Sequence, residues 1–372
     1  MSLRVVHASD LHLGRAFAGL PEDVRGRLVE ARHAALAALA AAARAHGAAH
    51  VLLAGDTFDS ETPSEPVLRQ ALAAMAEARD LTWWLLPGNH DSLAAEALWD
   101  RLAGARPPNV AVLAEAAPVE IAPGLLCLPA PVTRRAPGRD LTEWMTRAES
   151  APGTVRLGLA HGPVASFGRD GEGSDVIAPD RAASAGLDYL ALGDWHGRRA
   201  VCARSGYCGT PARARFKHDG RGVCLVVALD GPGSVPVVEP VEIGTFDWVA
   251  RDLLVTPRDD PETLVAEALP REHRRDTLLS LTLTGRTTLA GRLALGRAIA
   301  AAAPEFWYVE TDDTGLASEP ALGDLDAIAP SGALRLAADT LAAETAGADP
   351  RRAAVAGAAL GRLYALLAEA GS

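Results

Sequence analysis

Short apolar runs alternate with longer alanine-rich stretches through the first two hundred residues of the chain. Six of the runs are typical of buried strands, because each is short, apolar and ended by Gly, Pro, Asp or His. They are Leu3–Ala8, Val51–Ala54, Trp83–Leu86, Leu125–Leu128, Val155–Ala160 and Tyr189–Leu192. Between them, Val24–Ala45 and Glu65–Ala78 have the apolar spacing of helices, with Ser64 as the expected N-cap of the second. Strands that alternate with helices predict a layered α/β sheet, which binds ligands at the carboxyl ends of its strands.

Farther along the chain the pattern becomes mainly β and then mixed again. The expected strands are Gly222–Leu229, Val235–Ile243, Arg251–Thr256, Thr277–Thr284 and Phe306–Glu310, and the expected helices are Pro261–Leu269 and Leu289–Ala302. Asp312–Pro330 is acidic, contains Pro and Gly, and is predicted to be a linker. Asp349 before Pro350 marks the start of a C-terminal helix. We therefore expect three parts, residues 1–244, 245–322 and 323–372.

The composition is that of an ordinary globular protein. Of the 372 residues, 49% are hydrophobic and 22% are charged, and the length suits two domains. No apolar run is long enough to span a membrane and the N-terminus lacks a secretory pattern, so we expect a cytoplasmic protein without membrane association. The four cysteines form no CxxC pair, which indicates free thiols in a reducing compartment.

The charges of the chain are unevenly distributed. A net charge of −11 argues against a protein that coats nucleic acid. A basic run, broken only by Asp219, nevertheless extends from Arg198 to Arg221 and contains Lys217, the only lysine of the chain. The sequence leaves two interpretations of this run open: a surface that contacts phosphates, or a solvated hairpin.

Five short polar segments each follow a predicted strand. They are Asp10-Leu11-His12, Gly55-Asp56-Thr57-Phe58-Asp59, Gly88-Asn89-His90-Asp91, His161-Gly162 and Gly193-Asp194-Trp195-His196. By itself any one of them is usually a turn, but a doubly wound sheet brings strand ends to one edge, where all five can converge. Carboxylates and imidazoles together suit manganese, iron or zinc. Two such cations, about 3.5–4 Å apart, neutralise phosphate oxygens and activate water, so the set predicts a metal-dependent phosphoesterase.

In this order the five segments resemble the signature of the calcineurin-like metallophosphoesterase superfamily, which is D-x-H, G-D-x-x-D, G-N-H-D or G-N-H-E, His-Gly and G-H-x-H. The resemblance covers about residues 1–240. Within the superfamily the chain most resembles SbcD-type DNA repair nucleases, including YhaO-like bacterial members. The resemblance is carried by Ala8–Gly14, by Leu53–Asp59 followed by Thr62–Ser64, and by Tyr207–Pro211. The resemblance implies a four-layer α-β-β-α sandwich, a smaller C-terminal α/β capping domain and a helical tail.

The resemblance also implies a role for each residue of the segments. One metal ion would be held by Asp10, His12, Asp56 and His196, and the other by Asp56, Asn89, His161 and Asp194, with Asp56 as the bridge. His90 would stabilise the transition state or protonate the leaving oxygen, and we expect Asp91 to orient its imidazole. Asp59 is either part of the site or a carboxylate that caps its loop. Manganese is the expected metal, with magnesium, iron and zinc as alternatives.

At one ligand position the chain departs from the superfamily, because Asp194 stands where relatives have histidine. Aspartate can still coordinate and is a harder ligand than imidazole, so we expect the second site to prefer manganese or magnesium. The alternative is a second site that is weak or empty, which would make turnover slow.

For the substrate, the resemblance favours a DNA exonuclease or endonuclease that acts in DNA repair with an SMC-like coiled-coil ATPase, and a homodimer is compatible with it. Arg198, Arg199, Arg213 and Arg215 are the candidates for contacting phosphates. A small-molecule phosphodiesterase or phosphatase stays open, because this site serves many substrates. A third possibility is a weakly active subunit whose role is to dock a partner. Its C-terminal apolar stripe either binds that partner or packs on its own domain, and it consists of Leu360, Leu363, Tyr364 and Leu367.

Overall fold

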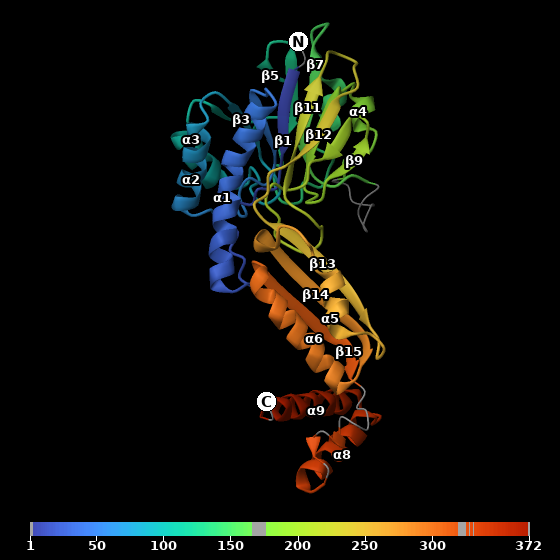
Figure 1. The fold of residues 1–372 in the computed structure, drawn as a ribbon. Coiled ribbons are helices and arrows are strands. Elements are labelled where there is room, and N and C mark those ends of the chain that lie inside the picture. Colours follow the sequence, from blue (N-terminus) through green and yellow to red (C-terminus); the bar gives the residue numbers. More distant parts are fainter. Residues whose placement is uncertain (1–2, 166–175, 319–324, 327, 330, 371–372) are drawn as a thin grey trace. The chain divides into compact units, whose positions relative to one another are not determined.

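The chain divides into two units, Met1–Asp247 and Trp248–Ser372. They are seen in a computed structural model that describes residues 3–165, 176–318, 325–326, 328–329 and 331–370 (Figure 1). Within these residues, no helix combines the length and the apolar character needed to cross a membrane.

The first unit is built on two six-stranded sheets. The strand order is β12-β11-β1-β2-β3-β4 in one sheet and β5-β6-β7-β8-β10-β9 in the other. In the first sheet β1 to β4 are parallel, and β11 is antiparallel to both of its neighbours, β1 and β12. In the second sheet β6, β7, β8 and β10 are parallel, and the edge strands β5 and β9 are antiparallel to them. The strands are β1 (Leu3–Ala8), β2 (His50–Ala54), β3 (Thr82–Leu86), β4 (Val110–Val112), β5 (Val119–Ala122), β6 (Leu125–Ala130), β7 (Val155–His161), β8 (Tyr189–Gly193), β9 (Arg199–Cys202), β10 (Ser205–Tyr207), β11 (Val223–Leu229) and β12 (Val237–Glu242).

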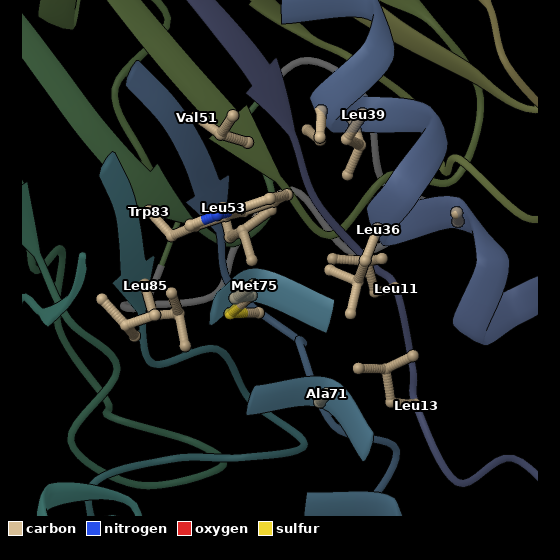
Figure 2. Close-up of a cluster of buried hydrophobic side chains, with 14 of the residues drawn as sticks. Leu11, Leu13, Leu36, Leu39, Val51, Leu53, Ala71, Met75, Trp83 and Leu85 are labelled. Carbon is tan, nitrogen blue, oxygen red and sulfur yellow. The ribbon is translucent and has the colours of Figure 1, made fainter. Parts of the chain in front are cut away.

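Helices cover the outer faces of both sheets. The first sheet packs against α1 (Glu22–Ala45), α2 (Glu65–Glu77) and α3 (Glu96–Ala105), and Figure 2 shows part of this core, with Leu36, Met75 and Trp83 among its members. Alternate residues of the same strands, such as Leu52 and Leu86, point the other way and pack against the second sheet. The second sheet in turn packs against a short 3₁₀ helix (Glu143–Arg147) and α4 (Arg181–Ser184). The four-layer α-β-β-α sandwich is therefore confirmed.

The second unit contains a three-stranded sheet in the order β13-β14-β15. Its elements are β13 (Asp247–Val255), α5 (Pro261–Ala268), β14 (Thr277–Thr287), α6 (Leu289–Ala302), β15 (Tyr308–Ser318), α8 (Ala333–Thr345) and α9 (Pro350–Ala370). The C-terminal stripe is occupied within this unit: Leu360 is fully buried with Ala338 and Ile328, and Leu363, Tyr364 and Leu367 pack against the same cluster. Of the two interpretations of the stripe, the structure shows packing on its own domain.

One predicted element was wrong and others were missed. The expected linker Asp312–Pro330 begins inside β15, because β15 pairs in parallel with β14 as far as Ser318. The two acidic side chains of the overlapping segment are tolerated because β15 is an edge strand, where Asp312 is exposed and Asp313 pairs with Arg292. The rest of the expected linker lies largely outside the described residues. The pattern also missed α3, α4 and the short strands β4, β5, β9 and β10, whose apolar runs are brief.

Candidate metal centre

The predicted ligands lie in loops that leave the two sheets at the same edge. In the first sheet the parallel strands β1, β2 and β3 deliver Asp10, Asp56 and Asn89 just beyond their carboxyl ends. In the second sheet β7 ends at His161 and β8 ends one residue before Asp194. The two edges meet, since His161 Nδ1 lies 2.8 Å from the carbonyl oxygen of Ala54 at the end of β2.

One half of the site is formed by Asp10, His12, Asp56 and His196. His12 Nε2 lies 3.9 Å from Asp10 Oδ1, 3.8 Å from Asp56 Oδ2 and 3.1 Å from His196 Nε2. His196 Nε2 lies 3.6 Å from Asp10 Oδ1. These donor atoms therefore surround a common point, as the predicted first metal site requires.

The other half of the site shares Asp56 with the first. His161 Nε2 lies 3.5 Å from Asp56 Oδ2 and 3.9 Å from Asp194 Oδ1. Asn89 precedes His90, whose backbone N–H donates to Asp56 Oδ1 at 2.9 Å. Because Asp56 has contacts in both halves, it occupies the position of the predicted bridge.

Buried donor atoms without partners show that metal ions fit here. Among the described residues, Asp10 Oδ1, Asn89 Oδ1 and His161 Nε2 are buried and have no hydrogen-bond partner. Leaving such groups unsatisfied costs about 1–3 kcal/mol each. A cation held by oxygen and imidazole nitrogen would satisfy them, and the donor set suits first-row divalent metals. When bound, two such ions supply charge neutralisation at the phosphate and a water of lowered pKa.

Burial and mutual attraction set the protonation of the site. Burial raises the pKa of Asp10 to about 7, with the neighbouring carboxylates adding to the effect. Burial also disfavours the charged forms of Asp56 and His161, but the attraction between the two side chains outweighs this effect. As a result, the pKa of Asp56 lies below its usual value and the pKa of His161 lies well above its usual value. Burial lowers the pKa of His12 and brings that of His196 to about 3, so both imidazoles are neutral and able to ligate.

Neighbouring groups orient the histidines that are predicted to bind metal. His161 directs Nδ1 to the Ala54 carbonyl, which leaves Nε2 facing Asp56. His12 Nδ1 lies 3.2 Å from Asp59 Oδ1, and Arg15 lies 3.4 Å from the same oxygen. Such carboxylate–histidine pairs fix the ring of a metal ligand. Of the two roles considered for Asp59, the structure favours the one within the site.

His90 and Asp91 lie differently from what the sequence suggested. The His90 ring is edge-on to His12, with centroids 4.7 Å apart, and its Nδ1 lies 2.9 Å from the Asp59 carbonyl oxygen. The expectation that Asp91 orients His90 was wrong. The buried Asp91 carboxylate instead accepts the N–H groups of Phe58 at 3.0 Å and Gly88 at 2.7 Å, because these turns leave backbone donors that need an acceptor.

The predicted phosphate-binding arginines fall into two groups. A cavity of about 190 Å³ adjoins the metal centre; Asp194 and His196 form one wall, and Arg213, Arg215 and Lys217 lie around it. Lys217 Nζ lies 4.6 Å from the centre of the Trp195 ring, which holds its charge beside this cavity. Arg198 and Arg199 are not among the residues that line it.

Sequence reasoning missed one buried cation next to the ligands. Arg32 of α1 is only 1% exposed and donates to the carbonyl oxygen of Leu11 and, at 2.9 Å, to that of Ala212. It therefore connects the Asp10–His12 turn with the loop that carries Arg213. A signal was present in the sequence, since Arg32 interrupts the apolar stripe of α1 between Leu28 and Leu36.

The sandwich, with carboxylate and imidazole groups gathered at its strand ends, defines a layered α/β protein with a candidate metal centre. The chain belongs to the calcineurin-like phosphoesterase family, whose sequence model matches residues 3–198. It is similar to the uncharacterized metallophosphoesterase YhaO of Bacillus subtilis (strain 168), with 28% identity over 231 residues. That match covers 58% of this chain and 54% of the relative, so it spans about half the relative's length. Among solved structures, TT1561 of Thermus thermophilus is similar over 65% of this chain and 100% of its own, at 10% identity and a TM-score of 0.41.

Proposed function

We propose that this protein is a metal-dependent phosphoester hydrolase that cleaves phosphodiester bonds in DNA, as an exonuclease or endonuclease of the SbcD type acting in DNA repair. The observation that carries the proposal is the cation-lined cavity directly beside Asp194 and His196. A metal centre alone suffices for a small phosphate ester. Adjacent guanidinium and ammonium groups suit a substrate that carries further phosphates next to the scissile one.

The loop that carries Arg213 and Arg215 is hydrogen-bonded to residues of the candidate metal centre. Thr210 donates its hydroxyl to the Asp10 carbonyl oxygen at 2.8 Å and its backbone N–H to the His196 carbonyl oxygen at 3.2 Å. Arg32 holds Ala212 from the other side. These contacts argue against a freely solvated hairpin, because the loop is tied at several points to residues that flank metal ligands.

For the metal we propose manganese. Oxygen donors from three aspartates and an asparagine outnumber the imidazoles, and hard ligands of this kind suit manganese or magnesium better than a softer metal. We further propose that the enzyme works in the cytoplasm, where its four free cysteines stay reduced.

An SMC-like coiled-coil ATPase is the proposed partner, and a homodimer the proposed assembly. Both proposals rest on the resemblance of the sequence motifs to SbcD-type nucleases. The C-terminal stripe does not add support, because it is already packed within the second unit.

The test is a manganese-dependent nuclease assay on linear and nicked duplex DNA beside an aryl phosphodiester. Combined Arg213→Glu and Arg215→Glu should weaken DNA binding and reduce the slope of log affinity against log salt by about 0.9 per lost contact. Hydrolysis of the aryl phosphodiester should be nearly unchanged. DNA affinity and salt dependence equal to those of the wild type would contradict the proposal.

The second candidate is a phosphodiesterase or phosphatase for small molecules such as cyclic nucleotides. The net charge of −11 favours it, because an acidic protein attracts long polyanions poorly. In that case the aryl phosphodiester is hydrolysed and duplex DNA is not.

A further inference from the structure

A second cavity, of about 300 Å³, opens at the carboxyl end of β6, and we call it the β6 cavity. Ala130 and Pro131 at the end of β6 line it, and so does Leu93, three residues after His90. The Leu93 N–H donates to the Val132 carbonyl oxygen at 2.9 Å, which ties the two loops together. The cavity therefore lies at the same edge of the sandwich as the metal ligands.

The sheet order places the two cavities on opposite sides of the metal centre. β6 is the neighbour of β7, which ends in His161, whereas the cavity beside Asp194 lies toward β8 and β10. From β6 to β10 there are three strand spacings, or about 14 Å. At the rise of B-DNA this distance corresponds to about four nucleotides of one strand.

The lining of the β6 cavity combines an aromatic ring with positive charge. Trp144, Leu141 and Leu93 supply apolar surface, and the exposed Arg139 and Arg147 lie in its wall. Asp140 also lines it, but this carboxylate is engaged by Arg181 at 2.8 Å and by the Thr142 hydroxyl at 2.5 Å.

Further charge lies along the same loop. Arg134 and Arg135 are exposed and immediately precede the segment that carries Arg139, while Glu143 is the remaining acidic group of the lining. An aromatic face next to cationic groups is the combination that binds single nucleic acid strands, through base stacking and phosphate contacts.

We propose that the β6 cavity is a substrate subsite that binds one nucleotide of a single strand, with its base on Trp144 and its phosphate between Arg139 and Arg147. The proposal rests on the proposed DNA substrate and assigns it a path across the metal centre, from the β6 cavity to the cavity beside Asp194. The volume of about 300 Å³ is at the lower end for ligand pockets, which suits a single nucleotide.

The test uses the full chain with a labelled single-stranded oligonucleotide, measured by fluorescence anisotropy in chelator so that no cleavage occurs. Combined Arg139→Glu and Arg147→Glu should weaken binding by about tenfold or more and lower the salt slope by about 1.4, which is two contacts at about 0.7 each. Arg79→Glu with Arg106→Glu is the matched control, because these exposed arginines precede β3 and β4 at the opposite edge.

The base contact is tested separately with Trp144→Ala, which should also lose about tenfold in affinity, and Trp144→Phe, which should recover most of it. All variants should bind manganese in calorimetry with the affinity of the wild type, which shows that fold and metal centre are intact.

Two results separate failure of this inference from failure of the proposed function. If the wild type binds the oligonucleotide and the Arg139/Arg147 variant binds as the control does, the subsite is refuted while the DNA substrate stands. If the wild type cleaves duplex DNA but binds no single-stranded oligonucleotide, only the subsite is refuted. If it hydrolyses the aryl diester but neither cleaves duplex DNA nor binds the oligonucleotide, both are refuted. Equal affinity of Trp144→Ala and wild type refutes the stacking contact.

Discussion

Replacing the buried Arg32 tests how the metal centre is held together. Arg32 is 1% exposed, and its guanidinium donates to Leu11 between two ligands and to Ala212 at 2.9 Å. Phe17 also lies against it, with the guanidinium carbon 5.2 Å from the ring centre. Arg32→Met keeps much of the side chain's volume but removes the charge and every donor.

The expected magnitude follows from these contacts. A hydrogen bond to a charged group contributes about 1.5–3 kcal/mol, so two such bonds together contribute about 3–6 kcal/mol. Burying the cation costs part of this gain, and the substitution removes that cost. We therefore expect the free energy of unfolding to fall by about 2–4 kcal/mol.

Urea unfolding measures this change, and calorimetric titration with manganese measures its consequence for the site. Leu11 lies between Asp10 and His12, so the loss of the hydrogen bond from Arg32 to the Leu11 carbonyl oxygen should loosen both predicted ligands. We therefore expect Arg32→Met to weaken manganese binding as well. Arg181→Met is the matched control: Arg181 is 8% exposed but binds Asp140 and Thr142, so its loss should destabilise the fold and leave metal affinity unchanged. The reasoning is refuted if Arg32→Met unfolds within about 0.5 kcal/mol of wild type, as a surface substitution would, or if both variants lose equal metal affinity.

Three further changes test other parts of the molecule. Asp194→His should shift the metal preference of the second site from manganese or magnesium toward zinc, measured by metal titration, and identical affinities and preferences would contradict our view of this ligand. Asp59→Asn should lower metal affinity by about 10–100-fold in calorimetry, because it weakens the group 3.2 Å from His12 Nδ1; unchanged affinity would leave Asp59 only its loop role. His7 is buried against Tyr189, and burial lowers its pKa from 6.5 to about 3. Below about pH 6.5 the imidazole is therefore protonated in the unfolded state but neutral in the folded state. The contribution of His7 to the free energy of unfolding is fully present above about pH 6.5 and declines by about 1.4 kcal/mol per pH unit as pH falls toward about 3. His7→Gln should show a correspondingly shallower loss in urea unfolding between about pH 6.5 and 4.5, and parallel curves would refute this.

The layered fold could be predicted because its central strands are continuous apolar runs. β1 matches the predicted Leu3–Ala8, and α6 matches Leu289–Ala302, since burial on one or both faces leaves a clear periodic signal. The shortest strands could not be found in this way, because β9 has only four residues and β10 only three. Of β15, only the beginning was predicted, because Asp312 and Asp313 in its middle do not resemble a buried strand.

That the predicted ligands lie close together could be foreseen because each follows a strand end, but the groups that support them could not be. Asp91 lies next to His90 in sequence, yet its carboxylate turns to the backbone of Phe58 and Gly88. Asp59 reaches His12 from a different loop, and Arg32 reaches Leu11 from a helix. Such contacts depend on the direction in which a side chain leaves its loop, and spacing along the sequence carries no information about that.

The backbone of the ligand turns explains why aspartate can stand at position 194. Asp10, His12, Asp56 and Asp194 have positive φ angles of 56°, 46°, 53° and 103°, a region that Asp, Asn and His adopt more readily than other side chains. A Cβ at Gly193 would collide with the Ala54 carbonyl oxygen, so the residue before Asp194 must be glycine. The Gly193-Asp194 motif is thus set by backbone geometry as well as by metal coordination.

Asp194→Ala would change both the backbone and the coordination, because alanine at φ 103° is strained in addition to lacking a ligand atom. Asp194→Asn keeps the backbone preference and one oxygen while removing the charge, and it is therefore the variant that isolates what this carboxylate contributes to the second metal site.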